Sequence, residues 1–198
     1  MLLQVKRFSS KLLLPLARKL KKIPANVFTA LGLIFAFLAF LGFLFNYLII
    51  IIISLFITEF FDQLDGVVAR IQGPTQLGAF LDSTLDRIGD LFMLIGVIFS
   101  GYTNLIVGLL VLIGAFLTPY TRAKIEALGV DNLYGVGLLE RTDRVPILLI
   151  GSILQIWFPT SIWWTMIILA IGTNITALQR IIYAIRKFST VRQIQNTD

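Results

Sequence analysis

Aspartates at helical spacing stand between two strongly apolar stretches of the chain, in "FFDQLDGVVARIQGPTQLGAFLDSTLDRIGDLF". In the first half, two carboxylates share a predicted helix face with two residues of minimal side chain, at i, i+3, i+4 and i+7: Asp62, Asp65, Gly66 and Ala69. In the second half, three residues recur every four positions: Gly78, Asp82 and Asp86. The short turn "QGPT" between them predicts two antiparallel neighbouring helices, whose acidic faces converge.

Carboxylates brought together in this way repel one another, so they are either protonated or hold cations. The chain has no histidine and no cysteine, so a metal site here would consist of oxygen ligands, which favours hard ions such as Mg²⁺, Mn²⁺ or Ca²⁺. Two divalent ions between the helices would clamp a phosphate group that undergoes displacement. Two other interpretations remain open at this point. Small residues at four-residue spacing often indicate only close helix packing, and acidic residues in spans can line a proton or cation pathway.

The elements that carry these residues are predicted to cross a membrane. The chain of 198 residues is 57% hydrophobic and 14% charged, and its mean hydropathy is +0.88. These values are typical of an all-α integral membrane protein, in which each crossing helix needs roughly 20 apolar residues. Six stretches meet or approach that length: Ala25–Phe45, Tyr47–Ile71, Gln76–Ser100, Thr103–Leu128, Arg144–Phe158 and Ser161–Phe188.

The basic residues gather at alternate ends of these stretches. Seven precede the first one, and others flank the second, fourth and sixth. The three remaining links carry no charge. By the positive-inside rule, both termini and the aspartates lie on the cytoplasmic side of a multi-pass cell-membrane protein.

The N-terminal segment interleaves leucine and valine with these seven cations, which predicts an amphipathic helix at the membrane surface. The alternative is a disordered basic tail. The predicted organisation is therefore a basic interfacial helix over residues 1–24, a six-span domain over 25–188 and a tail over 189–198. The net charge of +6 points to anionic headgroups of the bilayer and not to nucleic acid, because the cations crowd at one membrane face.

The two halves "DQLDGVVAR" and "GAFLDSTLD" resemble the signature of the CDP-alcohol phosphotransferase family, D-x-x-D-G-x-x-A-R followed by G-x-x-x-D-x-x-x-D. Every fixed position is filled. The resemblance implies that an alcohol attacks the β-phosphate of a CDP-linked lipid, and that CMP is released. It implies that Mg²⁺ or Mn²⁺ is held, as two ions, by Asp62, Asp65, Asp82 and Asp86.

The resemblance also implies roles for single residues. Asp86 is implied as the general base on the acceptor hydroxyl. The residues implied to bind the CDP moiety are Asp65, Gly66, Ala69, Arg70, Gly78 and Asp82. Asp90 lies outside the signature, and a structural role is expected for it. Family membership further implies a homodimer.

A second basic group indicates the acceptor. The segments "YTRAKIEALGV" and "GLLERTDR" carry four cations on the predicted cytoplasmic side: Arg122, Lys124, Arg141 and Arg144. A phosphorylated alcohol would use them, because a phosphate monoester carries up to two negative charges. The segments are similar to elements of phosphatidylinositol-phosphate and archaetidylinositol-phosphate synthases, which implies inositol 1-phosphate as the acceptor. One departure is Pro119, where serine is expected; Thr118 is the alternative source of a hydroxyl.

Several alternatives remain at the level of sequence. The four cations could serve only to set the topology. Glycerol 3-phosphate is also a phosphorylated alcohol, so a phosphatidylglycerolphosphate synthase is the nearest rival. CDP-diacylglycerol and CDP-archaeol are both compatible with apolar spans. A divalent-cation transporter is a rival of another class, but it predicts polar residues along the whole membrane path, whereas those of this chain stay at one end.

Overall fold

The computed structural model describes residues 12–130, 136–139 and 141–195, without the side chains of Arg141 and of residues 190–195. Within these residues every regular element is an α-helix, which confirms the all-α class. A helix over residues 12–20 is followed by α2 (Ala25–Leu44), α3 (Leu48–Gln72), α4 (Gln76–Phe99), α5 (Leu105–Ala127), α6 (Arg141–Leu154) and α7 (Ser161–Gln195).

The first four predicted spans agree with α2 to α5 to within about two residues at each end, which is the usual uncertainty of helix boundaries. The fifth differs, because α6 begins at Arg141 and ends at Leu154. Beyond Leu154 the chain turns at residues 155–157. The side chain of Gln155 stabilises this link. Its Nε2 atom donates to the Pro159 carbonyl at 2.5 Å, and its Oε1 atom accepts from the backbone amide of Ile162 at 2.9 Å. The last helix continues to Gln195, past the predicted end at Phe188.

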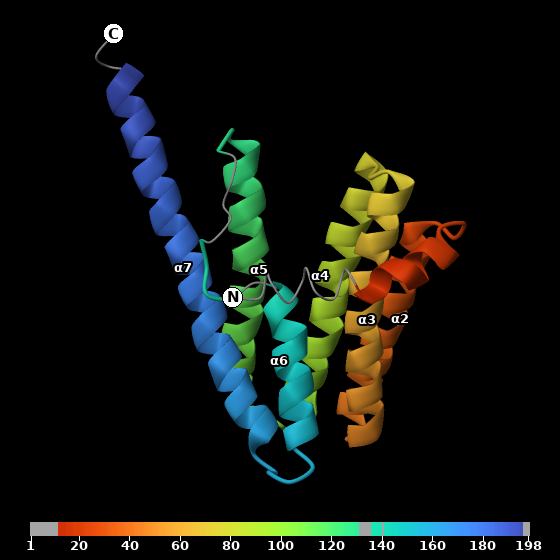
Figure 1. Ribbon diagram of the computed structural model, residues 1–198. Helices are drawn as coiled ribbons and strands as arrows, with labels where there is room; N and C mark the ends of the chain where they lie inside the picture. The colour runs from red at the N-terminus through yellow and green to blue at the C-terminus, as the bar shows by residue number, and fades with distance from the viewer. Residues whose placement is uncertain (1–11, 131–135, 140, 196–198) are drawn as a thin grey trace.

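The helices form two groups (Figure 1). In one group α2 packs against both α3 and α4, and in the other α7 packs against α5 and α6. Contacts of α3 with α6 and of α4 with α5 join the groups. The shared core runs through both and includes Phe43, Leu55, Val97, Val111 and Met166. The α3–α4 pair is thus backed by α2 along its length.

The helix over residues 12–20 lies on the α2–α3 pair. Its buried Ala17 belongs to a second cluster with Phe28, Leu64 and Val68. Gln72, the last residue of α3, ties down the link that follows this helix. Its side-chain amide donates to the carbonyls of residues 21 and 23, at 2.9 and 2.6 Å, and accepts from the amide of residue 25, at 3.1 Å. Residues 1–11 of the predicted interfacial segment lie outside the described residues.

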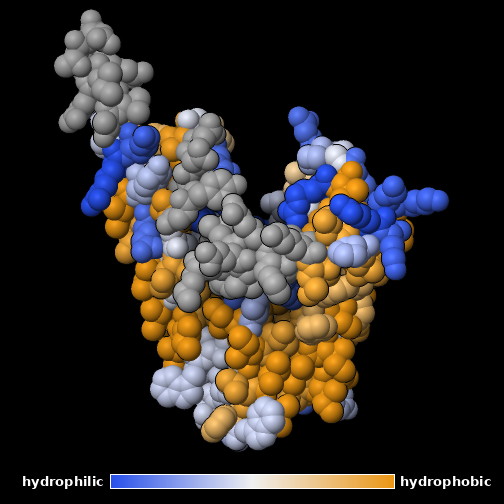
Figure 2. Space-filling model, in the orientation of Figure 1, coloured by the Kyte–Doolittle hydropathy of each residue, from blue (hydrophilic) through white to orange (hydrophobic). Residues whose placement is uncertain are grey.

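Three described helices are long and apolar enough to cross a membrane: Ala25–Leu44, Leu105–Ala127 and Ser161–Ser189. Helices α3 and α4 have 25 and 24 residues, but they carry the aspartates, and α6 has only 14 residues. Figure 2 shows hydrophobic residues over the lower flanks and hydrophilic residues at the upper end, where Figure 1 places the α3–α4 turn. The polar site therefore lies at one end of an apolar bundle.

Candidate active site

The turn between α3 and α4 sets the geometry of the site. Gly73 ends α3 with a φ of 93°, a conformation that residues with a side chain rarely adopt. Thr75 then caps α4, because its hydroxyl accepts a hydrogen bond from the Gly78 amide at 3.0 Å. Residues 73–75 thus reverse the chain, and the acidic faces of two antiparallel helices meet.

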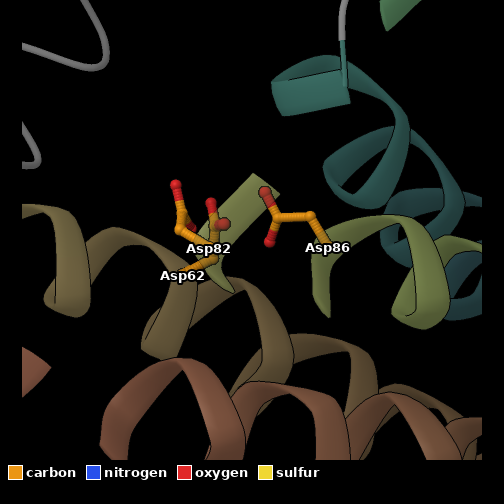
Figure 3. A group of neighbouring side chains, drawn as sticks. All are labelled: Asp62, Asp82 and Asp86. Carbon is orange, nitrogen blue, oxygen red and sulfur yellow. The ribbon is translucent and has the colours of Figure 1, made fainter. Parts of the chain in front are cut away.

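Three carboxylates gather between these helices (Figure 3). Asp62 comes from α3, and Asp82 and Asp86 come from successive turns of α4. One oxygen of each lies within 4.8 Å of the others, and all three side chains are half-buried. The predicted convergence of the two acidic faces is present in the structure for these three residues.

The fourth signature carboxylate, Asp65, lies deeper and is 5% exposed. Asp62, Asp65 and Asp86 line one small cavity, of about 20 Å³, whose other walls come from α2 and from deeper residues of α3 and α4. This volume is enough for about one water molecule or ion. Asp65 therefore faces the same enclosed space as two members of the carboxylate group.

The donor set fits a hard divalent cation. Carboxylate oxygens are the ligands that Mg²⁺ and Mn²⁺ prefer, and three of them within 4.8 Å are close enough to share ions. The same spacing is unfavourable for three ionised carboxylates alone, since like charges in a partly buried site repel. The three carboxylates therefore fit a site for a divalent ion.

The two glycines of the signature have different surroundings. A methyl group added to Gly66 would meet only the Arg70 guanidinium, at 4.0 Å. A methyl group on Gly78 would lie 2.9 Å from the Thr75 hydroxyl and 3.4 Å from the Asn26 side-chain oxygen. Arg70 is exposed, and Ala69 is half-buried in the preceding position. The signature glycines thus border an open surface on α3 and a tight corner at the start of α4.

Helix α2 supplies a wall of the site that the sequence did not indicate. Thr29, Gly32 and Ala36 line the small cavity, and Asn26 lies next to Gly78. None of these residues is acidic, so they do not belong to the carboxylate pattern that predicted the site. Their place at the site depends on the packing of α2 against α3 and α4, which local sequence patterns do not reveal.

The four predicted acceptor cations occupy different settings. The Arg122 guanidinium donates to Glu126 at 2.9 Å, and both side chains are partly exposed. Lys124 lines a mostly apolar groove of about 520 Å³ between α5 and α7. Arg141 is the first residue of α6, and its side chain lies outside the described atoms. The Thr118 hydroxyl, proposed as a substitute for the missing serine, donates to the carbonyl of residue 173 at 3.2 Å.

Arg144, the fourth cation, is 4% exposed and forms an ion pair with Asp90. Its Nη2 atom donates to Asp90 Oδ2 at 2.9 Å, and Arg87 Nη1 lies 3.5 Å from the same oxygen. Asp90 thus lies between two arginines, and its buried ion pair with Arg144 joins α4 to α6. No local pattern predicts this pairing, because the two residues are 54 positions apart.

Known proteins that resemble this chain in sequence belong to one enzyme family. The family model of CDP-alcohol phosphatidyltransferases matches residues 22–130. An archaetidylinositol phosphate synthase of Methanothermobacter thermautotrophicus is 39% identical over 166 residues, which cover 81% of this chain and 83% of that protein. A phosphatidylinositol phosphate synthase of Mycolicibacterium smegmatis is 36% identical over 154 residues, which cover 69% of this chain and 64% of that protein.

Solved structures of Mycobacterium tuberculosis phosphatidylinositol phosphate synthase have a similar fold. The structure with CDP-DAG bound has a TM-score of 0.75 at 28% identity, and the match covers 88% of this chain and 94% of that one. The structure in complex with manganese and citrate has a TM-score of 0.75 at 29% identity, over 86% and 87% of the two chains.

Neutralising one carboxylate should change the thermal stability in opposite directions with and without metal. Without divalent ions, Asp82→Asn should unfold at a higher temperature than the wild type, because it removes like-charge repulsion. With Mn²⁺ at about 100 times its dissociation constant, the wild type should gain about 2.7 kcal/mol, and the variant much less. The measurement is the unfolding temperature of detergent-solubilised protein in EDTA and in Mn²⁺.

Glu126→Gln on α5 is the matched control, since it also removes one acidic charge but away from the three carboxylates. It should gain as much from Mn²⁺ as the wild type does. Equal stabilisation of Asp82→Asn and wild type by Mn²⁺ would contradict the metal site.

Proposed function

Because the chain belongs to the CDP-alcohol phosphatidyltransferase family, we propose that it transfers a phosphatidyl or archaetidyl group from a CDP-linked lipid to a hydroxyl of inositol 1-phosphate. CMP is the second product. Membership of the family makes the chain a transferase. The observation that carries the proposal is the meeting of Asp62, Asp82 and Asp86 from two antiparallel helices, within 4.8 Å.

In this proposal Asp62, Asp65, Asp82 and Asp86 hold two divalent ions, Mg²⁺ or Mn²⁺. When bound, such ions neutralise phosphate charge and make a hydroxyl more acidic. A structure of the Mycobacterium tuberculosis enzyme in complex with manganese and citrate, at 29% identity, supports the binding of a divalent ion. Gly66, Ala69, Arg70 and Gly78 lie on the same two helices as the carboxylates. In this proposal they bind the CDP moiety together with Asp65 and Asp82. Asn26 lies next to Gly78 on the side of α2.

The reaction itself is a displacement at phosphorus. The acceptor oxygen forms a bond to the β-phosphorus of the CDP-lipid, and the bond from that phosphorus to the oxygen bridging the two phosphates breaks. The bridging oxygen leaves with CMP, and the lipid keeps the β-phosphate in a new phosphodiester. Asp86 orients the acceptor hydroxyl and receives its proton. A carboxylate is the available base because the chain has no histidine.

The acceptor is assigned from charge. A phosphate monoester needs cations, and in this proposal Arg122, Lys124 and Arg141 provide them on α5 and α6. Arg144, the fourth predicted ligand, is buried and is held by its ion pair with Asp90 instead. Relatives at 39% and 36% identity, named as archaetidylinositol and phosphatidylinositol phosphate synthases, support inositol 1-phosphate. Either CDP-archaeol or CDP-diacylglycerol suits the apolar flanks, and the latter was bound in the Mycobacterium tuberculosis structure.

We further propose that α2 to α7 all cross the cell membrane, with both termini and the active site on the cytoplasmic side. The apolar flanks of the bundle and the polar end that carries the α3–α4 turn support this arrangement (Figure 2). The helix over residues 12–20 then lies at the membrane surface, against α2 and α3. The homodimer implied by the family stays a prediction.

Purified protein given Mg²⁺ and a CDP-lipid should release CMP when inositol 1-phosphate is supplied. It should release much less with glycerol 3-phosphate, inositol or serine, because the first has a different shape and the other two lack the phosphate monoester. Activity with another of these alcohols alone would contradict the acceptor and keep the reaction class. Metal flux through liposomes without CDP-lipid would instead favour the transporter.

Asp86→Asn should reduce the rate of CMP release by about 10² to 10⁴-fold, the usual contribution of a positioned acid or base. The variant should still bind the CDP-lipid, because the amide keeps an oxygen that can ligate a metal. Ser83→Ala is the control on the same helix, since Ser83 is exposed and outside the signature. Near-normal turnover by Asp86→Asn would overturn the role of this residue as the base.

A further inference from the structure

The buried Asp90–Arg144 ion pair has no place in the family signature, and it uses for a contact between helices the arginine that the sequence predicted as a phosphate ligand. Helix α6 packs mainly on α3 and α7, so this pair is a polar link from α6 to α4. Both side chains are nearly inaccessible, at 3% for Asp90 and 5% for Arg144. Removing two charges from water is costly, and apolar residues would join two helices at least as well. A directional ion pair at this position therefore suggests that α6 needs a defined register against α4.

That register concerns the active site. Helices α4 and α6 run in the same direction (Figure 1). Asp86 precedes Asp90 by one turn of α4, about 6 Å of helix rise, and Arg141 precedes Arg144 by about 4.5 Å. Pairing Asp90 with Arg144 thus brings the first residue of α6 to the level of Asp86, to within about one helical turn.

The chain that leads into α6 is held from the other side by α7. The amides of Leu138 and Leu139 donate to the Thr176 hydroxyl at 3.0 and 2.8 Å. The guanidinium of the buried Arg180 donates to the Val136 carbonyl at 3.0 Å. The start of α6 is therefore held between α7 and the ion pair, which connects it to the helix that carries Asp82 and Asp86.

We propose that Asp90 is a positioning residue for the part of the active site that binds the acceptor alcohol, at the start of α6. Through Arg144 it sets the register of α6 and so holds the start of that helix, with Arg141, beside Asp86. The inference rests on the proposed function, because it assumes that Arg141, at the start of α6, receives the acceptor phosphate. It predicts that the pair controls acceptor binding and leaves the CDP-lipid site, on α3 and α4, unaffected.

The test is a kinetic series in which KM is measured separately for the acceptor and for the CDP-lipid. Asp90→Asn should raise KM for the acceptor by about tenfold, as expected when one charge-assisted hydrogen bond to a phosphate is weakened. KM for the CDP-lipid should change by less than about twofold. Asp90→Glu keeps the carboxylate and should recover much of the acceptor affinity.

Two further variants separate positioning from stability. Leu148→Ala, at a buried residue of α6 one turn beyond Arg144, should lower the unfolding temperature without changing KM for the acceptor. The double variant Asp90→Leu with Arg144→Met should regain thermal stability, because an apolar pair avoids the desolvation cost. Its KM for the acceptor should stay raised, since apolar contacts do not fix the register as a hydrogen-bonded pair does.

Recovery of acceptor KM together with stability in the double variant would overturn the inference and leave a purely structural ion pair. An equal rise of both KM values in Asp90→Asn would also overturn it. The acceptor used is the alcohol with which the wild type releases CMP. If that alcohol is not inositol 1-phosphate, the proposed acceptor fails, and the Asp90 series with the active alcohol still decides the inference.

Discussion

Repulsion between carboxylates is the constraint on which the arrangement of this protein depends. Oxygens of Asp62, Asp82 and Asp86 lie within 4.8 Å of one another. If all three were ionised, each pair would be destabilised by about 3 kcal/mol at an effective dielectric constant of about 20. Cations between α3 and α4 would reverse the sign of this energy. In the proposed metal site the ions offset this repulsion, and the rest of the bundle holds α3 and α4 in place for them.

The surrounding packing provides that support. Helix α2 lies along both α3 and α4, and it can do so because small residues face it. A methyl group on Gly89 would lie 3.3 Å from Ala36, and one on Gly96 would lie 3.0 Å from the backbone of residue 40. Close approach of this kind is what glycine provides between membrane helices. Asp90 lies one turn beyond Asp86 on α4, and its charge is neutralised by the Arg144 guanidinium of α6. In the two proposals, ions hold Asp82 and Asp86 for the reaction, whereas the arginine on α6 pairs with Asp90 and sets the register of that helix.

Much of this could be predicted from the sequence, because it depends on local spacing. The four-residue steps that end in Asp82 and Asp86, the turn at Gly73 and the apolar stretches all act within one or two helices. The rest depends on contacts between residues far apart in the chain. The Asp90–Arg144 pair and the Gln72 bonds to residues 21 and 23 join segments about 50 positions apart, at which no local pattern exists. The wall formed by α2 escaped prediction for the same reason. The roles of Arg122 and Arg141 stay predictions, as do the orientation in the membrane and the identity of the alcohol.

A crystal structure of the protein with Mn²⁺ and a CDP-lipid, measured at the manganese absorption edge, would test the metal site most directly. The proposed site predicts two anomalous peaks about 3.5–4 Å apart, in contact with Asp62, Asp65, Asp82 and Asp86. No peak between α3 and α4, or manganese bound only elsewhere, would contradict it.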